Sequence, residues 1–175
     1  MEEFLRFRNI LDARKRSARI LILGDYSENP AYDGPIGKCL DTLKGLQSHL
    51  WREGFNETRL VMDFMDEEGV PEESYDEHFL KKSEYYIRQW ADILLFVLLQ
   101  DGDSQSVIRE WSYMIKVCPD KCRNAVMLRN TNVRIGALVR GDIKSHRITN
   151  DTFTDTNALF NGAYTLCFNK LYNLV

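Results

Sequence analysis

Glu110 is the side chain of this sequence whose position best suits chemistry. It follows a run of seven apolar residues, 93–99, and an acidic segment that contains Asp101 and Asp103. A continuous apolar run bounded by turn residues is typical of a buried parallel strand. Open α/β sheets bind their ligands beyond the carboxyl ends of such strands. The pattern therefore predicts that Glu110 and the two aspartates lie near a concave, partly dry site at the edge of a sheet.

The residues around Glu110 indicate what it could do there. Val107, Ile108 and Trp111 are apolar, and burial among them would raise the pKa of the carboxyl group. In such a site a carboxylate acts as a nucleophile or stabilises a developing cation. The plain alternative is a glutamate in the first turn of a helix, where the helix dipole favours it and a preceding serine caps the helix. The residues alone leave both interpretations open.

A second group of candidates follows the first predicted strand, residues 19–24. The polar loop after this strand, residues 25–35, is longer than a simple connection requires, and such loops often carry function. Its candidate ligand-contacting side chains are Asp25, Tyr26, Asn29 and Asp33. The loop has neither the G-x-G-x-x-G fingerprint of dinucleotide folds nor the G-x-x-x-x-G-K-[ST] of P-loops. Its acids Asp25 and Glu28 would repel the phosphate of a flavin, so no cofactor is expected.

Alternating strands and helices are predicted to position these candidates. The further predicted strands are residues 58–64 and 124–129, and β-like fragments at 135–139 and 146–149 indicate an edge strand. The predicted helices are residues 2–18, 36–53, 78–90 and 155–172, and one that holds Glu110 in its first turn and ends near residue 117. Gly54 is expected to end the second helix in a left-handed conformation. This alternation predicts a single flavodoxin-like α/β domain over residues 1–175, an open, mainly parallel sheet of about five strands with helices on both faces.

Composition and charge narrow the classes of partner. Hydrophobic residues make up 44% and charged residues 28% of the 175 residues, and the formal net charge is -3, as in an ordinary globular protein. Such a chain disfavours disorder and nucleic-acid binding. No apolar run is long enough to span a bilayer, and the N-terminal residues lack a signal-peptide pattern. We therefore expect no membrane partner and a cytoplasmic location.

Two small clusters have a plain explanation and a functional alternative. Cys118 and Cys122 would need two further ligands to bind zinc, and the three histidines do not supply them at a usual spacing. The four cysteines are therefore expected to be reduced thiols, and no metal is expected.

The basic residues that close the first predicted helix are Arg14, Lys15, Arg16 and Arg19. A solvated helix end accounts for them, and a phosphate or nucleic-acid patch is the alternative.

The order of these features resembles the nucleoside 2-deoxyribosyltransferase-like superfamily, which includes Toll/interleukin-receptor (TIR) domains that cleave NAD. The resemblance covers about residues 19–115. It lies in the first and central strands, the Asp-Gly-Asp-Ser loop at 101–104, and the run Glu110-Trp111-Ser112-Tyr113. In the transferases a glutamate that opens the helix after the central strand attacks the anomeric carbon of the sugar. In TIR domains a serine and a glutamate four residues apart occupy a similar turn, as Ser106 and Glu110 do here.

The resemblance implies an enzyme that breaks a C–N glycosidic bond of a nucleoside, nucleotide or NAD-like molecule. Glu110 would attack or shield the anomeric carbon, and Asp101 or Asp103 would contact the leaving base or the ribose hydroxyls. Tyr26 or Trp111 would stack on the base. Ser106, from the resemblance, and Asp25, from the long first loop, complete the predicted substrate-binding set.

The chain also departs from the transferase pattern. The first loop lacks the usual Gly-Pro run, and Trp111-Ser112 replace small residues, so the base and the sugar stay open. The alternative function is a non-catalytic nucleotide sensor or a TIR-like protein-interaction module. The sequence also leaves open whether the protein is a homo-oligomer that completes its own sites.

Overall fold

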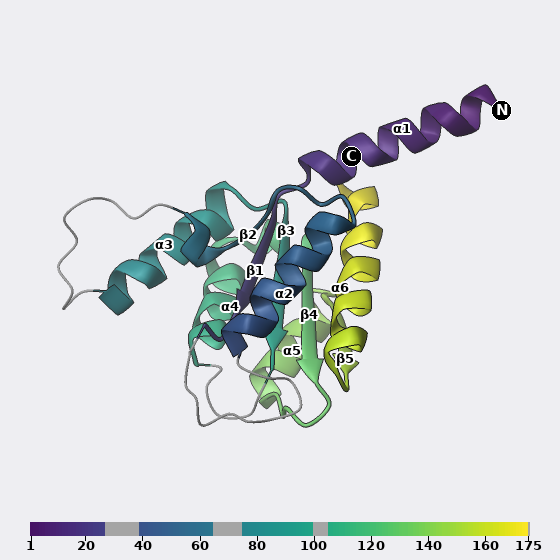
Figure 1. The fold of residues 1–175 in the computed structure, drawn as a ribbon. Helices are drawn as coiled ribbons and strands as arrows, with labels where there is room; N and C mark the ends of the chain where they lie inside the picture. The colour runs from purple at the N-terminus through teal and green to yellow at the C-terminus, as the bar shows by residue number, and fades with distance from the viewer. Residues whose placement is uncertain (27–38, 65–74, 100–104, 175) are drawn as a thin grey trace.

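The computed structural model of the chain describes residues 1–26, 39–64, 75–99 and 105–174. In this part of the chain five strands form one sheet, and every neighbouring pair is parallel (Figure 1). The strand order is β2-β1-β3-β4-β5. The strands are β1 (Ile20–Gly24), β2 (Thr58–Leu60), β3 (Ile93–Leu98), β4 (Ala125–Asn130) and β5 (Thr149–Phe153). The predicted flavodoxin-like fold is confirmed, with a wholly parallel sheet.

Helices cover both faces of the sheet (Figure 1). α2 (Cys39–Arg52) and α6 (Thr156–Lys170) pack on one face. α3 (Tyr75–Gln89), α4 (Gln105–Val117) and α5 (Ala137–Ser145) pack on the other. Successive side chains of a strand point to opposite faces, so each strand can contribute to both layers of packing.

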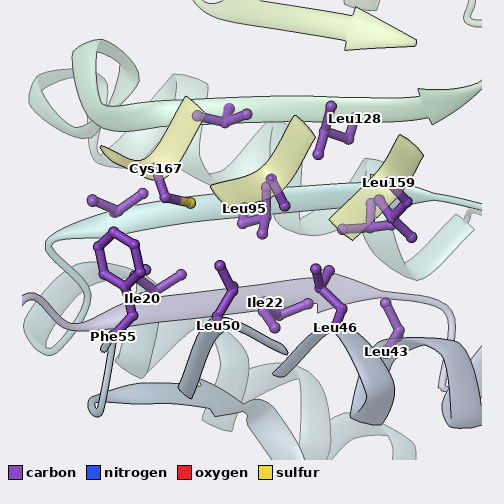
Figure 2. Close-up of a cluster of buried hydrophobic side chains, with 14 of the residues drawn as sticks. Ile20, Ile22, Leu43, Leu46, Leu50, Phe55, Leu95, Leu128, Leu159 and Cys167 are labelled. Atoms are coloured by element: carbon purple, nitrogen blue, oxygen red, sulfur yellow. The ribbon is translucent and has the colours of Figure 1, made fainter. Parts of the chain in front are cut away.

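Two buried cores hold these layers together. Figure 2 shows part of the first core, in which residues of β1, β3 and β4 meet α2 and α6. Its labelled side chains are Ile20, Ile22, Leu43, Leu46, Leu50, Phe55, Leu95, Leu128, Leu159 and Cys167. The second core takes the intervening strand residues, such as Leu94 and Phe96, together with Trp111 of α4. All six residues of β3 are buried, which explains why its sequence is apolar without alternation.

The two central strands define where a ligand would enter. β1 and β3 lie side by side, in register from Ile20 opposite Ile93 to Gly24 opposite Val97. The helix that follows β1 packs on one face of the sheet, and the helix that follows β3 packs on the other. In flavodoxin-like folds this divergence opens a crevice beyond the carboxyl ends of the two strands, where ligands bind. The end of β1 and the start of α4 are therefore the expected borders of a site.

The predicted strand at 58–64 is wrong in its second half. β2 ends at Leu60, and Val61–Asp63 form the 3-10 helix η1. The Asp63 carboxylate accepts a hydrogen bond from the Leu60 backbone N–H at 2.7 Å and another from the Gln47 amide. A side chain that bonds to the backbone three residues earlier favours a turn over a continued strand.

The β-like fragment at 135–139 is also wrong, because this segment leads into α5. Val139 is buried and Ile143 partly buried in the second core, and residues four apart share one face of a helix. The edge strand is β5, further along the chain than the fragment at 146–149 indicated. The predicted cap of α2 is confirmed, since Gly54 has a φ of 95°.

The N-terminal helix α1 (Glu2–Ser17) precedes the sheet and projects away from it (Figure 1). Leu11 packs against the first core near the base of this helix. Leu5, Phe7 and Ile10, in contrast, are 51%, 55% and 49% exposed. Within the described segments, every helix is too short or too polar to cross a membrane.

Candidate active site

Glu110 lies in the second turn of α4, because this helix begins five residues earlier, at Gln105. The expected position in the first helical turn is therefore wrong. A helix dipole acts chiefly within the first and last turns, so it does not account for this glutamate. The side chain must be explained by the residues that surround it in the fold.

The Glu110 carboxyl group is buried between α4 and α3. Only 2% of the residue is exposed, and Oε2 has no hydrogen-bond partner in the described part of the chain. Burial raises the pKa of Glu110 to about 8, a hydrogen bond with the Ser83 hydroxyl opposes this rise, and the charge of Glu84 adds to it. Most Glu110 side chains are therefore protonated at neutral pH.

Ser83 is the neighbour that can respond to the protonation of Glu110. It is completely buried, and its hydroxyl donates to the Leu80 carbonyl at 2.9 Å. A hydroxyl has one proton and two acceptor lone pairs. While its proton is engaged with Leu80, Ser83 can accept the proton of a neutral Glu110 carboxyl group.

Tyr26 lies on the other border of the site, two residues beyond β1. Its hydroxyl donates to the Ile22 carbonyl at 2.5 Å and accepts from the Val61 N–H at 3.4 Å, while its ring meets Phe79 edge-on at 5.4 Å. Burial raises the pKa of Tyr26 well above its ordinary value, and the charge of Glu110 contributes to the rise. Tyr26 is thus a fixed, neutral phenol whose pKa rises further when Glu110 is ionised.

The fold brings together only some of the residues singled out in the sequence. Tyr26 and Glu110 interact electrostatically although they are far apart in the chain. Asp25 is half-buried directly after β1, and Ser106 is exposed in the first turn of α4. Asp101 and Asp103 lie outside the described residues.

Trp111 has a place in the core. The residue is completely buried, its ring meets Phe96 edge-on at 5.1 Å, and Nε1 donates to the Asp142 carboxylate at 3.1 Å. Successive residues of a helix point about 100° apart, so Glu110 and Trp111 face different neighbours. A ring without exposed surface offers no face on which a base could stack.

Ser83 was not among the residues that the sequence singled out. It lies four residues from both Phe79 and Ile87, so it occupies the apolar face of α3. A hydroxyl on an otherwise apolar helix face is a signal that a buried polar partner exists elsewhere. The sequence does not identify that partner, which is Glu110 on α4.

The arrangement suits chemistry that uses one carboxyl group in two states. Protonated Glu110 can donate a proton. Ionised Glu110 can bond to carbon or stabilise a cation, and the attraction between charges is stronger in a buried site than in water. The described segments hold no group of three His, Cys, Asp or Glu side chains that could bind a metal ion, and all four cysteines are buried.

No family model matches this chain, and no curated protein matches it. The function is therefore inferred from the residues around Glu110 themselves.

Proposed function

We propose that the protein breaks a C–N glycosidic bond of a nucleoside, nucleotide or NAD-like substrate, with Glu110 as the reacting carboxyl group. The observation that supports this is a buried carboxyl oxygen without a hydrogen-bond partner in the described structure, on the helix that follows the central strand β3. An unsatisfied buried polar atom costs about 1–3 kcal/mol. Groups with such costs and strongly raised pKa values occur most often at functional sites.

The proposed reaction has two steps. First, an oxygen of ionised Glu110 bonds to the anomeric carbon while the C–N bond breaks, and the bonding electron pair leaves with the base. The base of a nucleoside or nucleotide takes up a proton as it leaves, whereas the positively charged nicotinamide of an NAD-like substrate leaves as a neutral molecule without one. Water then attacks the same carbon, frees the Glu110 carboxylate and gives the sugar hydroxyl and one proton. In a transferase a second base replaces the water. Both steps pass through an oxocarbenium-like state that a neighbouring carboxylate stabilises, as in glycoside hydrolysis.

Because the pKa of Glu110 is raised, the pH dependence of kcat/KM can show whether this side chain attacks the sugar or protonates the leaving base. As the attacking group it must be ionised, so kcat/KM should rise with pH up to about 8 and then level off. As the acid that protonates the leaving base it must be neutral, so kcat/KM should fall through the same pH range. The proposal favours the rising profile. A substrate must also widen the space around Glu110, because the residue is 2% exposed.

Base release by the Glu110→Gln variant tests the proposal. Purified protein is incubated with adenosine, AMP or NAD, and the free base is measured by chromatography. We expect release by the wild type and a loss of at least 100-fold in Glu110→Gln, which keeps the size of the side chain but cannot attack carbon. Glu53→Gln is the matched control, since Glu53 is exposed at the end of α2 and should leave the rate unchanged. Full activity of Glu110→Gln, or no release from any of the three substrates, would contradict the proposal.

A protein-interaction module is the second candidate, because of the apolar side chains on α1. Leu5, Phe7 and Ile10 are about half exposed on a helix that projects from the domain (Figure 1). Sedimentation velocity and calorimetry separate the candidates. Concentration-dependent assembly without small-molecule binding favours the interaction module, and nucleotide binding without turnover favours a sensor.

A further inference from the structure

A cavity lies at the opposite edge of the sheet from the carboxyl ends of β1 and β3. Its volume is about 450 Å³, within the range of small-molecule sites. It is bordered by the end of α1, by Asp92 just before β3, and by the 3-10 helix η3 (Pro119–Asn124) just before β4. The cavity is therefore at the amino edge of the sheet and shares no residue with the site around Glu110.

The walls of this cavity carry an excess of positive charge in an acidic protein. Arg14, Lys121 and Arg123 line it, together with the carboxylates Asp92 and Asp120. Arg19, beside the cavity, donates to both oxygens of Asp92, at 2.8 and 3.1 Å, so Asp92 is compensated. The remaining three cations face one carboxylate.

Two arginines, Arg14 and Arg123, line the cavity. Among the described residues, neither Arg14 nor Arg123 forms an ion pair. Lys121 Nζ donates to the Ala91 carbonyl at 2.5 Å, and its charge helps to lower the pKa of Asp92. Guanidinium groups form paired hydrogen bonds with phosphate, and an ammonium group acts as a point charge beside them.

Asn124 supplies an independent indication of a ligand. It lines the cavity, is 7% exposed, and its Oδ1 is buried without a hydrogen-bond partner in the described part of the chain. A native protein rarely leaves such an atom unsatisfied. Oδ1 is itself covered, so the Asn124 side chain must turn toward the cavity before a ligand hydroxyl can donate to this oxygen. Together with the Asp120 carboxylate, it suits a ligand that carries hydroxyl groups as well as an anion.

We propose that this cavity binds a small sugar phosphate, with the phosphate held by Arg14, Lys121 and Arg123 and the hydroxyls held by Asp120 and Asn124. The cavity volume fits a ligand of this size up to a mononucleotide. Asp120 disfavours an anion that has no hydroxyl to donate, because the carboxylate would repel it. This binding site is independent of the reaction proposed for Glu110.

Calorimetric titration of the full chain with ribose 5-phosphate tests the proposal. We expect saturable binding that weakens with added salt, weaker binding of inorganic phosphate, and no binding of ribose alone. Arg14→Gln and Arg123→Gln should each weaken binding on the order of tenfold, since each removes a charged hydrogen-bond donor. Arg16→Gln is the matched control, because Arg16 is exposed on α1 and does not line the cavity.

Three results would overturn the proposal. They are no saturable heat with ribose 5-phosphate, affinity that is unchanged in the Arg14→Gln/Arg123→Gln double variant, and inorganic phosphate binding as tightly as ribose 5-phosphate. The melting temperature of each variant without ligand verifies that it is folded. Ser17→Ala adds a variant that leaves all charges in place, and it should weaken binding less than either arginine substitution.

Discussion

Replacing Glu110 by glutamine should change how the stability of the protein depends on pH. The ordinary pKa of a glutamate is 4.5, and in the folded protein burial raises the pKa of Glu110 to about 8. Between these values the unfolded chain has lost the proton while the folded chain keeps it, so a rise in pH favours unfolding. The contribution of neutral Glu110 is thus fully present below about pH 4.5 and is lost as the pH rises toward 8.

The size of this effect follows from the two pKa values. Each pH unit between the two pKa values lowers the free energy of unfolding by at most about 1.36 kcal/mol. Over the full interval the free energy of unfolding falls by on the order of 5 kcal/mol. By the same calculation, the free energy of unfolding falls by about 3 to 4 kcal/mol between pH 5 and pH 8. Small proteins are stable by only about 5–15 kcal/mol, so the wild type should weaken measurably over this range.

Urea denaturation at pH 5, 6, 7 and 8 and constant ionic strength measures the effect. Other groups also titrate, but they cancel in the difference between the unfolding free energies of the wild type and Glu110→Gln. This difference should move by about 3 to 4 kcal/mol in favour of the variant from pH 5 to pH 8. For Glu53→Gln, an exposed control, it should stay constant. Parallel stability curves for wild type and Glu110→Gln would refute the burial of an ionisable carboxyl group at this position.

Two further predictions concern the packing around the central strands. Trp111→Ala should cost about 3–5 kcal/mol of unfolding free energy in urea, because the ring is completely buried, and a loss below about 1 kcal/mol would contradict its place in the core. Gly24→Ala should cost about 1–3 kcal/mol, because a Cβ at this position would lie 2.7 Å from Leu43 Cδ1, and the added methyl group overpacks the first core. Unchanged stability of this variant in urea would show that Leu43 moves aside freely.

Local sequence patterns predict much of the fold. The apolar run of β3 predicts a strand buried on both faces, and the structure buries all six residues. The glycine after α2 predicts a left-handed cap, and Gly54 has a φ of 95°. The alternation of such elements leaves few topologies, because parallel strands need crossover connections. These predictions succeed because each depends on residues that are neighbours in the chain.

Element boundaries depend on contacts that a local pattern does not contain. β2 ends early because Asp63 bonds to the Leu60 backbone and to Gln47 of α2. α4 begins at Gln105, so Glu110, which was expected in the first turn, lies in the second. The early end of β2 arises because side-chain hydrogen bonds override the intrinsic preference of the segment.

The sequence by itself determined the sheet, its helices and the choice of Glu110, because periodicity and apolar runs are read along the chain. Only the tertiary structure decided what surrounds Glu110: Ser83 from α3 and Tyr26 from the end of β1. Only the tertiary structure also shows that Trp111 lies in the core and that Arg14 and Arg123 line one cavity. The physical reason is that burial and pKa depend on distances in space, and residues far apart in the chain become neighbours only when the sheet and its helices pack.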